Sequence, residues 1–294
     1  MSFLHGVATV KRKKRRIAPY RLGQIIASII TLGHVPALWT GDVYQGVLKS
    51  ACVPILNCWG CPLSLFSCPI GGLQHFLNLH LFPFYIVGFF GVVGMLVGRM
   101  VCGWLCPFGM LQDLLYKIKS FYWKLPVWTT YIKYGVLVIV AGVIAWITRE
   151  PWFCKACPAG ILEAGIPLVL ADKGGDIRAL VGWLFWSKII FLTLVLALTI
   201  PIKRFFCRVF CPVGAIYSLF NRFSLVHLSI EKEKCKSPKC GVCVAICPMD
   251  INVYDNPNQK ECIRCLECVY KCPNIAVNMN FYQPRLKITE KETA

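Results

Sequence analysis

The sequence has few acidic residues, few histidines and few charged residues of any kind. Only 14 of the 294 residues are Asp or Glu, five are His, and 16% are charged, whereas 56% are hydrophobic and the mean hydropathy is +0.59. Such a chain is too apolar for an ordinary soluble enzyme. It also contains no P-loop, no nucleotide-binding glycine motif and no credible hydrolytic triad, so these enzyme classes are excluded.

The shortage of acid leaves a formal charge of +18, carried by 32 Lys and Arg. A basic chain suggests nucleic acid, but these residues lie mostly beside apolar stretches, where they set membrane orientation. We therefore expect no nucleic-acid partner. Cysteine, in contrast, is abundant, with 18 in the chain. A disulfide scaffold explains that number only in a small secreted domain, so metal or cluster ligation is the better interpretation.

Four apolar stretches are long enough to cross a hydrocarbon core of about 30 Å, which takes about 20 helical residues. They run over Leu22–Trp39, Leu81–Val101, Val127–Thr148 and Val181–Ile202. None resembles a cleaved signal peptide, because a basic arm precedes the first and no small-residue cleavage motif follows it. We expect an all-α membrane domain of four transmembrane helices over residues 22–228, preceded by a basic arm over residues 1–21.

Lys and Arg concentrate on one side of these spans. They fill the N-terminal arm, recur in the 102–126 connection and follow the fourth span as Lys203, Arg204 and Arg208. This bias predicts a multi-pass protein of the cell (cytoplasmic) membrane with both termini in the cytoplasm. Lys133 and Lys188 fall inside spans near their ends, where snorkelling explains them at least as well as a functional charge does.

Residues 229–294 form a separate, cysteine-dense segment with two similar runs. The runs are Cys235-x4-Cys240-x2-Cys243-x3-Cys247-Pro248 and Cys262-x2-Cys265-x2-Cys268-x3-Cys272-Pro273. Three close thiolates and a distant fourth before Pro are typical of bacterial two-cluster ferredoxins, in which the fourth Cys of each run ligates the other cluster. The x4 spacing of the first run departs from that pattern. A pair of zinc sites is the alternative, although the repeated spacing is far more typical of clusters.

The resemblance to those ferredoxins implies a small α+β domain with two 4Fe-4S clusters on the cytoplasmic side. One cluster takes Cys235, Cys240, Cys243 and Cys272, and the other takes Cys262, Cys265, Cys268 and Cys247.

The other ten cysteines include a repeat. Arg99-Met-Val-Cys102-Gly-Trp-Leu-Cys106-Pro107 recurs as Arg204-Phe-Phe-Cys207-Arg-Val-Phe-Cys211-Pro212, and Cys58-Trp-Gly-Cys61-Pro62 recurs as Cys154-Lys-Ala-Cys157-Pro158. This duplication predicts two parallel tandem repeats, over about residues 22–126 and 127–228, related by an axis along the membrane normal.

Symmetry places equivalent half-sites at the same depth, where they meet at the axis. The inner quartet, near the cytoplasmic face, would be Cys102, Cys106, Cys207 and Cys211, and an outer site would be Cys58, Cys61, Cys154 and Cys157. Cys68 also lies in a Cys-Pro-x-Gly turn and is an alternative to Cys61. We expect one or two further 4Fe-4S clusters here. Buried structural cysteines, or a disulfide on the outer side, are the alternatives.

These Cys-x3-Cys-Pro pairs, the four spans and the double-cluster run together resemble the NapH/NosR-type membrane iron–sulfur proteins, or polyferredoxins. The resemblance implies a subunit that passes electrons between a quinol pool or cytoplasmic donor and a partner beyond the membrane. It implies redox partner proteins on one or both sides, lipid contact and a quinone among the possible partners. The outer cysteine pairs depart from the NapH-type pattern, and no large flavin-binding domain of the NosR kind is present, which favours a relay of clusters through the membrane.

Few residues suggest bond-making chemistry. No Cys-x-x-Cys-His haem motif occurs, and His34, His75 and His80 are best explained as structural. A quinol site would need a proton acceptor, for which His75, His80 or Glu163 would serve. We therefore expect no catalytic residues and an electron-transfer subunit of a membrane oxidoreductase complex. The alternatives are a quinol dehydrogenase or copper reductase, and a metal-handling assembly factor whose outer thiolates bind Cu(I).

Overall fold

The computed structural model describes residues 18–40, 42–118, 120–172, 174–179, 181–235 and 240–281. Most of the basic arm and the C-terminal tail, both expected on the cytoplasmic side, lie outside these ranges.

The first part of the core runs from residue 18 to residue 118. Its elements are α1 (Pro19–Thr31), α2 (Ala37–Thr40), η1 (Val47–Ser50), α3 (Pro69–Asn78), α4 (Phe84–Val97), α5 (Met100–Trp104) and α6 (Pro107–Leu115). The second part follows after a connection. Its elements are η2 (Val127–Tyr131), α7 (Ile132–Gly135), η3 (Val136–Ile144), α8 (Ala145–Thr148), α9 (Trp152–Ala156), α10 (Pro158–Gly160), η4 (Ile161–Gly165), α11 (Ile166–Ala171), α12 (Asp176–Ala179), α13 (Trp183–Thr199), α14 (Phe205–Val209) and α15 (Pro212–Phe220).

Three of the four expected spans contain helices too short to cross a membrane. α1, α4 and α13 have 13, 14 and 17 residues, against the roughly 20 that a span needs. In the described part of the chain, only the 22-residue helix Val127–Thr148 is long and apolar enough to cross, judged by length and composition. The prediction of an all-α membrane domain with four transmembrane helices is therefore wrong.

Proline and glycine end the apolar runs early. Pro83 and Gly98 flank α4, and Gly182 and Pro201 flank α13. Gly98 has φ 58° and ψ −134°, a backbone conformation that glycine adopts far more readily than other residues. An apolar run fixes the composition of a segment, but helix breakers decide where its backbone hydrogen bonding stops.

The two parallel tandem repeats predicted for this domain are also wrong, because no four-helix repeat is evident among the described residues. α1 is followed by α2 and a long irregular segment with one isolated bridge between Cys52 and Ser67, whereas the Val127–Thr148 helix leads directly into α9. What does recur is local. A short helix carrying the first cysteine of a Cys-x3-Cys-Pro motif precedes a helix that begins at the Pro, once in α5 and α6 and again in α14 and α15.

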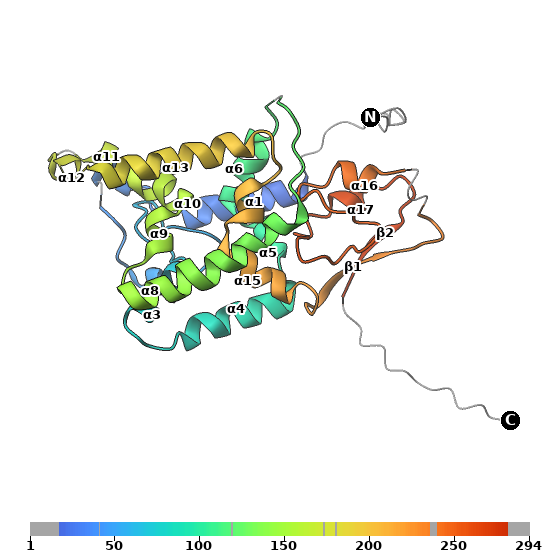
Figure 1. Ribbon diagram of the computed structural model, residues 1–294, viewed down its shortest axis with the longest axis horizontal. Coiled ribbons are helices and arrows are strands. Elements are labelled where there is room, and N and C mark those ends of the chain that lie inside the picture. Colours follow the sequence, from blue (N-terminus) through green and yellow to red (C-terminus); the bar gives the residue numbers. More distant parts are fainter. Residues whose placement is uncertain are drawn as a thin grey trace.

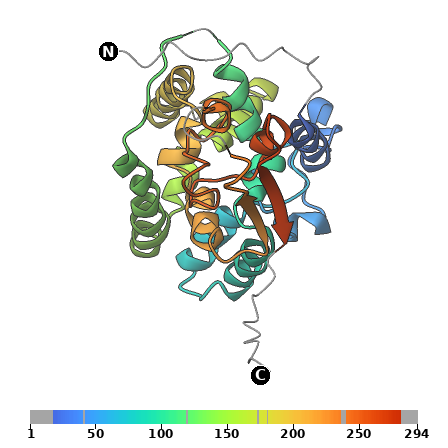
Figure 2. The same ribbon diagram turned by 90° about the vertical axis from the view of Figure 1, so that its right-hand side faces the viewer.

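The C-terminal module, residues 226–281, caps one end of this helical core (Figure 1). Its strands β1 (Val226–Ile230) and β2 (Val277–Phe281) pair antiparallel, with Val226 opposite Phe281 and Ile230 opposite Val277. The short helices α16 (Val242–Ala245) and α17 (Glu267–Tyr270) lie between the strands in sequence. In the end-on view of Figure 2 the module stands in front of the core helices.

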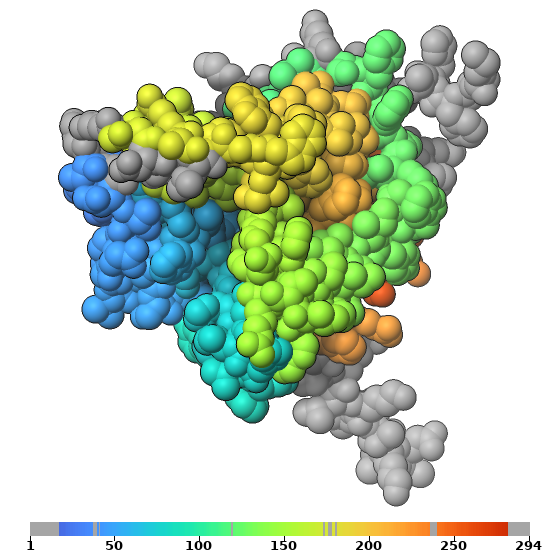
Figure 3. All heavy atoms as spheres, turned by 60° about the vertical axis from the view of Figure 1, so that its left-hand side comes forward, coloured from blue at the N-terminus to red at the C-terminus, as the bar shows by residue number. Residues whose placement is uncertain are grey.

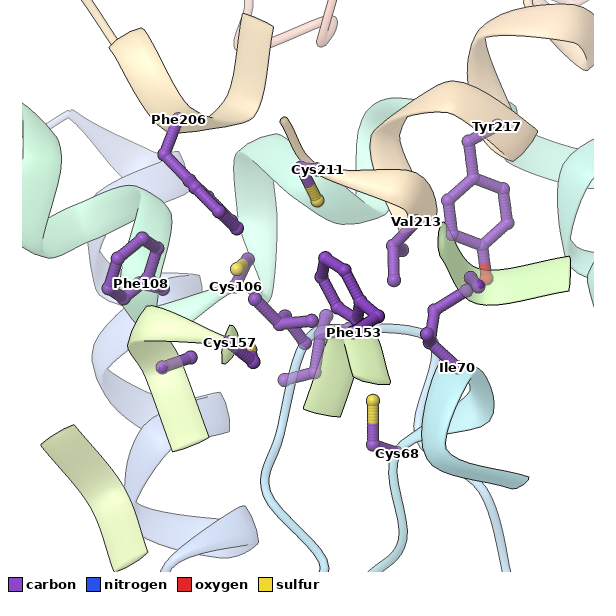
Figure 4. Close-up of a cluster of buried hydrophobic side chains, with 14 of the residues drawn as sticks. Cys68, Ile70, Cys106, Phe108, Phe153, Cys157, Phe206, Cys211, Val213 and Tyr217 are labelled. Carbon is purple, nitrogen blue, oxygen red and sulfur yellow. The ribbon is translucent and has the colours of Figure 1, made fainter. Parts of the chain in front are cut away.

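The cysteines lie in two buried hydrophobic clusters. The core cluster contains Cys68, Cys106, Cys157 and Cys211 around Phe153 and other apolar side chains (Figure 4). The module cluster contains cysteines of both module runs, and Tyr20 from α1 and Trp104 from α5 pack into it. Figure 3 shows the end of the core that lies away from the module. There, blue atoms from the early part of the chain lie beside yellow atoms of the region around α13.

Candidate metal centres

Four cysteines occupy the same backbone position. Cys68, Cys106, Cys157 and Cys211 each directly precede a helical segment that starts at Pro (α3, α6, α10 and α15), and their ψ angles lie between 112° and 131°. Pro suits the first helical position because its missing N–H is not needed there. At Cys211, the Gly214 amide donates to Sγ at 3.4 Å. Each turn therefore presents its sulfur to backbone amides that favour a thiolate.

The structure brings the inner quartet together. Burial and the thiols of Cys207, Cys102 and Cys106 all raise the pKa of the Cys211 thiol. The Gln112 side chain donates from Nε2 to the sulfur of Cys207 at 3.0 Å. Three buried cysteines and the half-buried Cys102 thus interact with one another, and amide donors reach two of the sulfurs, an arrangement that suits ligation of one cluster by four thiolates.

The charges around the inner quartet and the adjoining module loop also fit an anionic group. The buried cations there are Arg99, Lys133, Arg204, Arg208 and Arg264. Asp113 pairs with Arg204 at 2.7 Å, and Glu261 pairs with both Arg99 and Lys133. Positive charge is thus in excess, and a buried surplus of one sign is costly. A 4Fe-4S cluster with four thiolates, at about −2 when oxidised, would offset that surplus.

The outer cysteines surround a cavity of about 540 Å³, which we call the outer cavity. Its lining includes Cys52, Cys58, Cys68, Cys154 and Cys157. Burial and the thiols of Cys154, Cys68 and Cys58 raise the pKa of the Cys157 thiol. These four sulfurs therefore lie near one another.

Cys61, which the sequence placed in the outer site, is not among the described residues that line the outer cavity. The backbone amides of Leu63 and Ser64 face its thiol instead, and no helix follows its Pro. Of the two alternatives that the sequence left open, Cys68 lines the outer cavity with Cys58, Cys154 and Cys157, whereas Cys61 lies beside Cys58 and raises the pKa of its thiol without lining the cavity.

A glycine lines this cavity beside the Cys58 sulfur, and a carboxyl group accepts a hydrogen bond from the Cys58 backbone. A Cβ atom on Gly160 would lie 3.4 Å from the Cys58 sulfur, so glycine leaves room beside it. Glu163 Oε2 accepts from the Cys58 amide at 2.9 Å, and burial raises the pKa of Glu163 to about 7. The cavity thus combines sulfur ligands with space that a larger side chain would fill.

The module cysteines fall into the two interleaved groups. Burial and the thiols of Cys247, Cys262 and Cys268 raise the pKa of Cys265, and all four line a cavity of about 20 Å³ that Cys243 of the other group also lines. The other set lines a second cavity, of about 30 Å³. Its cysteines are Cys235, Cys240, Cys243 and Cys272.

Sites for a single metal ion, such as zinc, and histidines as haem ligands were the other possibilities that the sequence raised. Within the described ranges, no three His, Cys, Asp or Glu side chains are placed to hold one metal ion. His34 Nδ1 lies 3.1 Å from the Pro62 carbonyl, and His80 Nε2 accepts from Arg149 at 3.1 Å. His75 lines the outer cavity.

Two residues near these sites have surroundings that the sequence analysis did not predict. Lys133 does not snorkel, since its side chain is fully buried and pairs with Glu261. Cys52 lines the outer cavity, and its sulfur lies 3.3 Å from Ser67 Oγ. A lysine within an apolar run was the visible indication for the first. The indication for Cys52 was a cysteine without a partner in the other half.

Comparison with known proteins connects part of this chain with 4Fe-4S binding. A family model described as a 4Fe-4S binding domain matches residues 79–126, 134–168 and 183–231, which include the inner quartet, Cys154 and Cys157. No solved structure matches.

Three relatives are informative. The uncharacterized proteins MJ0749 and MJ0750 of Methanocaldococcus jannaschii are 32% and 31% identical, over 68% and 65% of this chain and 71% and 75% of their own lengths. The regulatory protein NosR of Stutzerimonas stutzeri is 29% identical over 61% of this chain, but only 25% of NosR is covered. The chain thus belongs to the family of MJ0749 and MJ0750 and is an iron–sulfur electron-transfer protein of the NosR type.

Proposed function

We propose that this protein passes single electrons between a donor at the C-terminal module, on the cytoplasmic side of the cell membrane, and an acceptor at the outer cavity. A 4Fe-4S cluster, when bound, takes up and releases one electron at a time, and the protein supplies its position and tunes its potential. We expect redox partner proteins at one or both ends. We expect the chain to act as a subunit of a larger oxidoreductase.

The proposed ligands are the cysteines that the structure brings together. In the module they are Cys235, Cys240, Cys243 and Cys272 for one cluster, and Cys247, Cys262, Cys265 and Cys268 for the other. In the core they are the inner quartet and, at the outer cavity, Cys58, Cys68, Cys154 and Cys157.

The observation that carries this proposal is that the cysteine groups adjoin one another from module to outer cavity. The thiol of Cys243, which belongs to one module group, raises the pKa of the Cys268 thiol, which belongs to the other. Trp104, next to the inner quartet in sequence, donates from Nε1 to the Arg264 carbonyl of the module loop at 3.0 Å.

The inner quartet and the outer cavity share one hydrophobic core. Phe153 packs in it, and in Figure 4 its ring lies between Cys106 and Cys211 on one side and Cys68 on the other. Tyr217 is fully buried in the same core, and its ring meets Phe90 edge to face with 5.3 Å between centroids. A dry, tightly packed partition of this kind excludes water between two redox sites.

Membrane association is supported by the surface of the core. Large apolar side chains stand more than half exposed on several helices, among them Ile29, Phe84, Ile147 and Trp183. Exposed apolar surface on this scale is typical of a membrane or protein interface. Val127–Thr148 is the candidate span. We propose that the module lies on the cytoplasmic side because Lys203, Arg204 and Arg208 lie at that end.

The deciding experiment counts iron and acid-labile sulfide per chain, on protein purified without oxygen. About 16 of each corresponds to four cubanes and supports the relay, and about 12 leaves the outer cavity for a dithiol or another metal. About 8 confines clusters to the module and contradicts the relay. The companion assay seals the protein in vesicles and follows electron passage from a reduced dye outside to an impermeant oxidant inside. Replacing the inner quartet by serine should abolish that passage.

One observation favours a second candidate, a quinol dehydrogenase or a copper reductase. The outer cavity is much larger than either module cavity, and at about 540 Å³ it falls within the range of small-molecule sites. His75 and Tyr85 line it and would serve as proton donors or acceptors. This candidate predicts turnover of a quinol or Cu(II) by the purified chain alone, with loss of turnover in His75→Ala.

A further inference from the structure

The module meets the core through several polar contacts, among them those of Arg264 and Asn221, and one of the contacts is a chain of buried charges. Arg99 donates from Nη2 to the carbonyl of Cys207, in the inner quartet, at 2.8 Å. Its Nη1 donates to the Glu261 carboxylate and, at 3.3 Å, to the Lys260 carbonyl, both in the module. The second oxygen of Glu261 accepts from Lys133. Arg99 therefore touches both an inner cysteine and the residue that directly precedes Cys262.

A second arginine also donates to the backbone carbonyl of an inner-quartet cysteine, but it pairs with a different carboxylate. Arg204, three residues before Cys207 as Arg99 is before Cys102, donates from Nη1 to the Cys102 carbonyl at 3.3 Å. Its other nitrogens donate to both oxygens of Asp113 at 2.7 Å. Asp113 belongs to α6, within the core.

The sequence explains why the two arginines differ. Asp113 is the seventh residue after Cys106, and the seventh after Cys211 is Ser218, which carries no charge. Ser218 instead pairs with the Tyr134 hydroxyl at 2.6 Å. The core thus lacks a carboxylate for Arg99 at the position equivalent to Asp113, and the module supplies one from Glu261.

Burial makes this contact consequential. The Arg99 and Lys133 side chains are 1% and 0% exposed and that of Glu261 is 14% exposed, so the two cations would be unpaired without the module. Buried ion pairs are costly to break from one side, because the remaining charge stays uncompensated. Asn221 Nδ2 donates to the carbonyls of Gln259 and Cys262, on either side of Glu261, so neutral hydrogen bonds and the ion pair hold the same loop.

The geometry points to Glu261 as a charged anchor that docks the Cys262 loop of the module on the core. It is a positioning residue that holds the Cys262 loop against the inner quartet through Arg99 and Lys133. The consequence for electron passage rests on the function proposed above, whereas the docking itself does not.

The test compares Glu261→Gln with Asp113→Asn, which removes the matching charge of the other pair. Hydrogen exchange of the backbone amides of residues 259–266 measures docking. Magnetic coupling between reduced clusters, seen by electron paramagnetic resonance, measures the contact between sites. We expect Glu261→Gln to keep its iron, to exchange at least about tenfold faster in this loop and to lose coupling. Glu261→Asp, which keeps the charge, should restore part of both.

Asp113→Asn should leave exchange of the module loop unchanged, because Arg204 pairs within the core. Wild-type exchange and coupling in Glu261→Gln would overturn the inference, as would loss of iron from that variant or equal loosening in Asp113→Asn. A wild-type protein without core iron would contradict the relay, yet the exchange comparison would still decide whether Glu261 docks the module.

Discussion

Cys61 and Cys68 show at the level of single residues how similar motifs acquire different roles. Both precede a Pro, but only Cys68 is followed by a helix, and only Cys68 lines the outer cavity. The sequence already contained the distinguishing feature, since Gly71 completes the same Cys-Pro-x-Gly turn that is found at Cys106, Cys157 and Cys211. The shorter Cys58-x2-Cys61 pairing competed with it because Cys154-x2-Cys157 has the same spacing.

This difference gives a direct prediction for the outer cavity. Cys68→Ala should lower the iron and sulfide content by about four atoms of each per chain, because a cubane lacking one thiolate is lost or degraded. Cys61→Ala is the matched control and should leave both counts unchanged. Analysis of both variants after purification without oxygen makes the comparison. The reverse pattern would show that Cys61 is the ligand.

The ion pair of Arg204 and Asp113 gives a second prediction, which concerns the sign of the charge at the inner quartet. With an anionic cluster bound, Arg204→Gln leaves Asp113 beside another anion and should cost about 3–5 kcal/mol of stability. Asp113→Asn leaves Arg204 paired with the cluster charge and should cost clearly less. Denaturation followed by loss of the cluster absorbance measures both. Equal costs would contradict an anionic inner site.

At the scale of elements, the short helices α5 and α14 matter more than the long ones. They present Cys102 and Cys207, and α5 also forms the surface on which the module loop rests. That contact depends on glycine. A Cβ atom on Gly103 would lie 2.6 Å from the Ile263 carbonyl oxygen, which is backbone and has little freedom to move.

Gly103→Ala should therefore push the module loop away from α5. We expect a destabilisation of about 1–3 kcal/mol, as is usual for overpacking, which outweighs the gain in helix propensity. Gly88→Ala in α4 is the control, because nothing lies within 4 Å of its added Cβ, and it should be neutral or stabilising by up to about 1 kcal/mol. Thermal unfolding of both variants tests this. A neutral Gly103→Ala would mean that the loop is not tightly seated there.

The whole molecule combines a core with an exposed apolar surface and a module that carries its own cysteines. The Val127–Thr148 helix is the single described helix that satisfies the length and composition of a span, yet exposed apolar residues also occur on α1, α4 and α13. A surface of this kind in water would drive aggregation or membrane binding.

The chain should accordingly remain in the membrane fraction after washing with high salt or alkaline carbonate and be released only by detergent. Val138 and Ile139 are both more than half exposed near the middle of the candidate span. Replacing both by Lys should reduce membrane retention, because a charged side chain at the centre of a span costs about 2.5–3.5 kcal/mol. The same double replacement at exposed Ile275 and Phe281 of the module is the control and should leave retention unchanged. Full release of the wild-type chain by salt would contradict membrane insertion.

The sequence by itself determined the chemistry, because ligand type and spacing are local properties. Cys-Pro turns, the two runs of the module and the paired Cys-x3-Cys motifs predicted iron–sulfur sites, and a 4Fe-4S family model matches the segments that carry the paired Cys-x3-Cys motifs. Hydropathy, in contrast, overestimated the helices, since it measures composition and is insensitive to where Pro83 or Gly98 ends a helix.

Only the tertiary structure decided which side chains meet. It brought Cys68 to the outer cavity, buried Lys133 and paired Glu261 of the module with Arg99 of the core. Glu261 and Arg99 are 162 positions apart, and Ser218 fills the place where a repeat would put the second carboxylate. Long-range charge pairing depends on how the module packs against the core, and no local pattern encodes that packing.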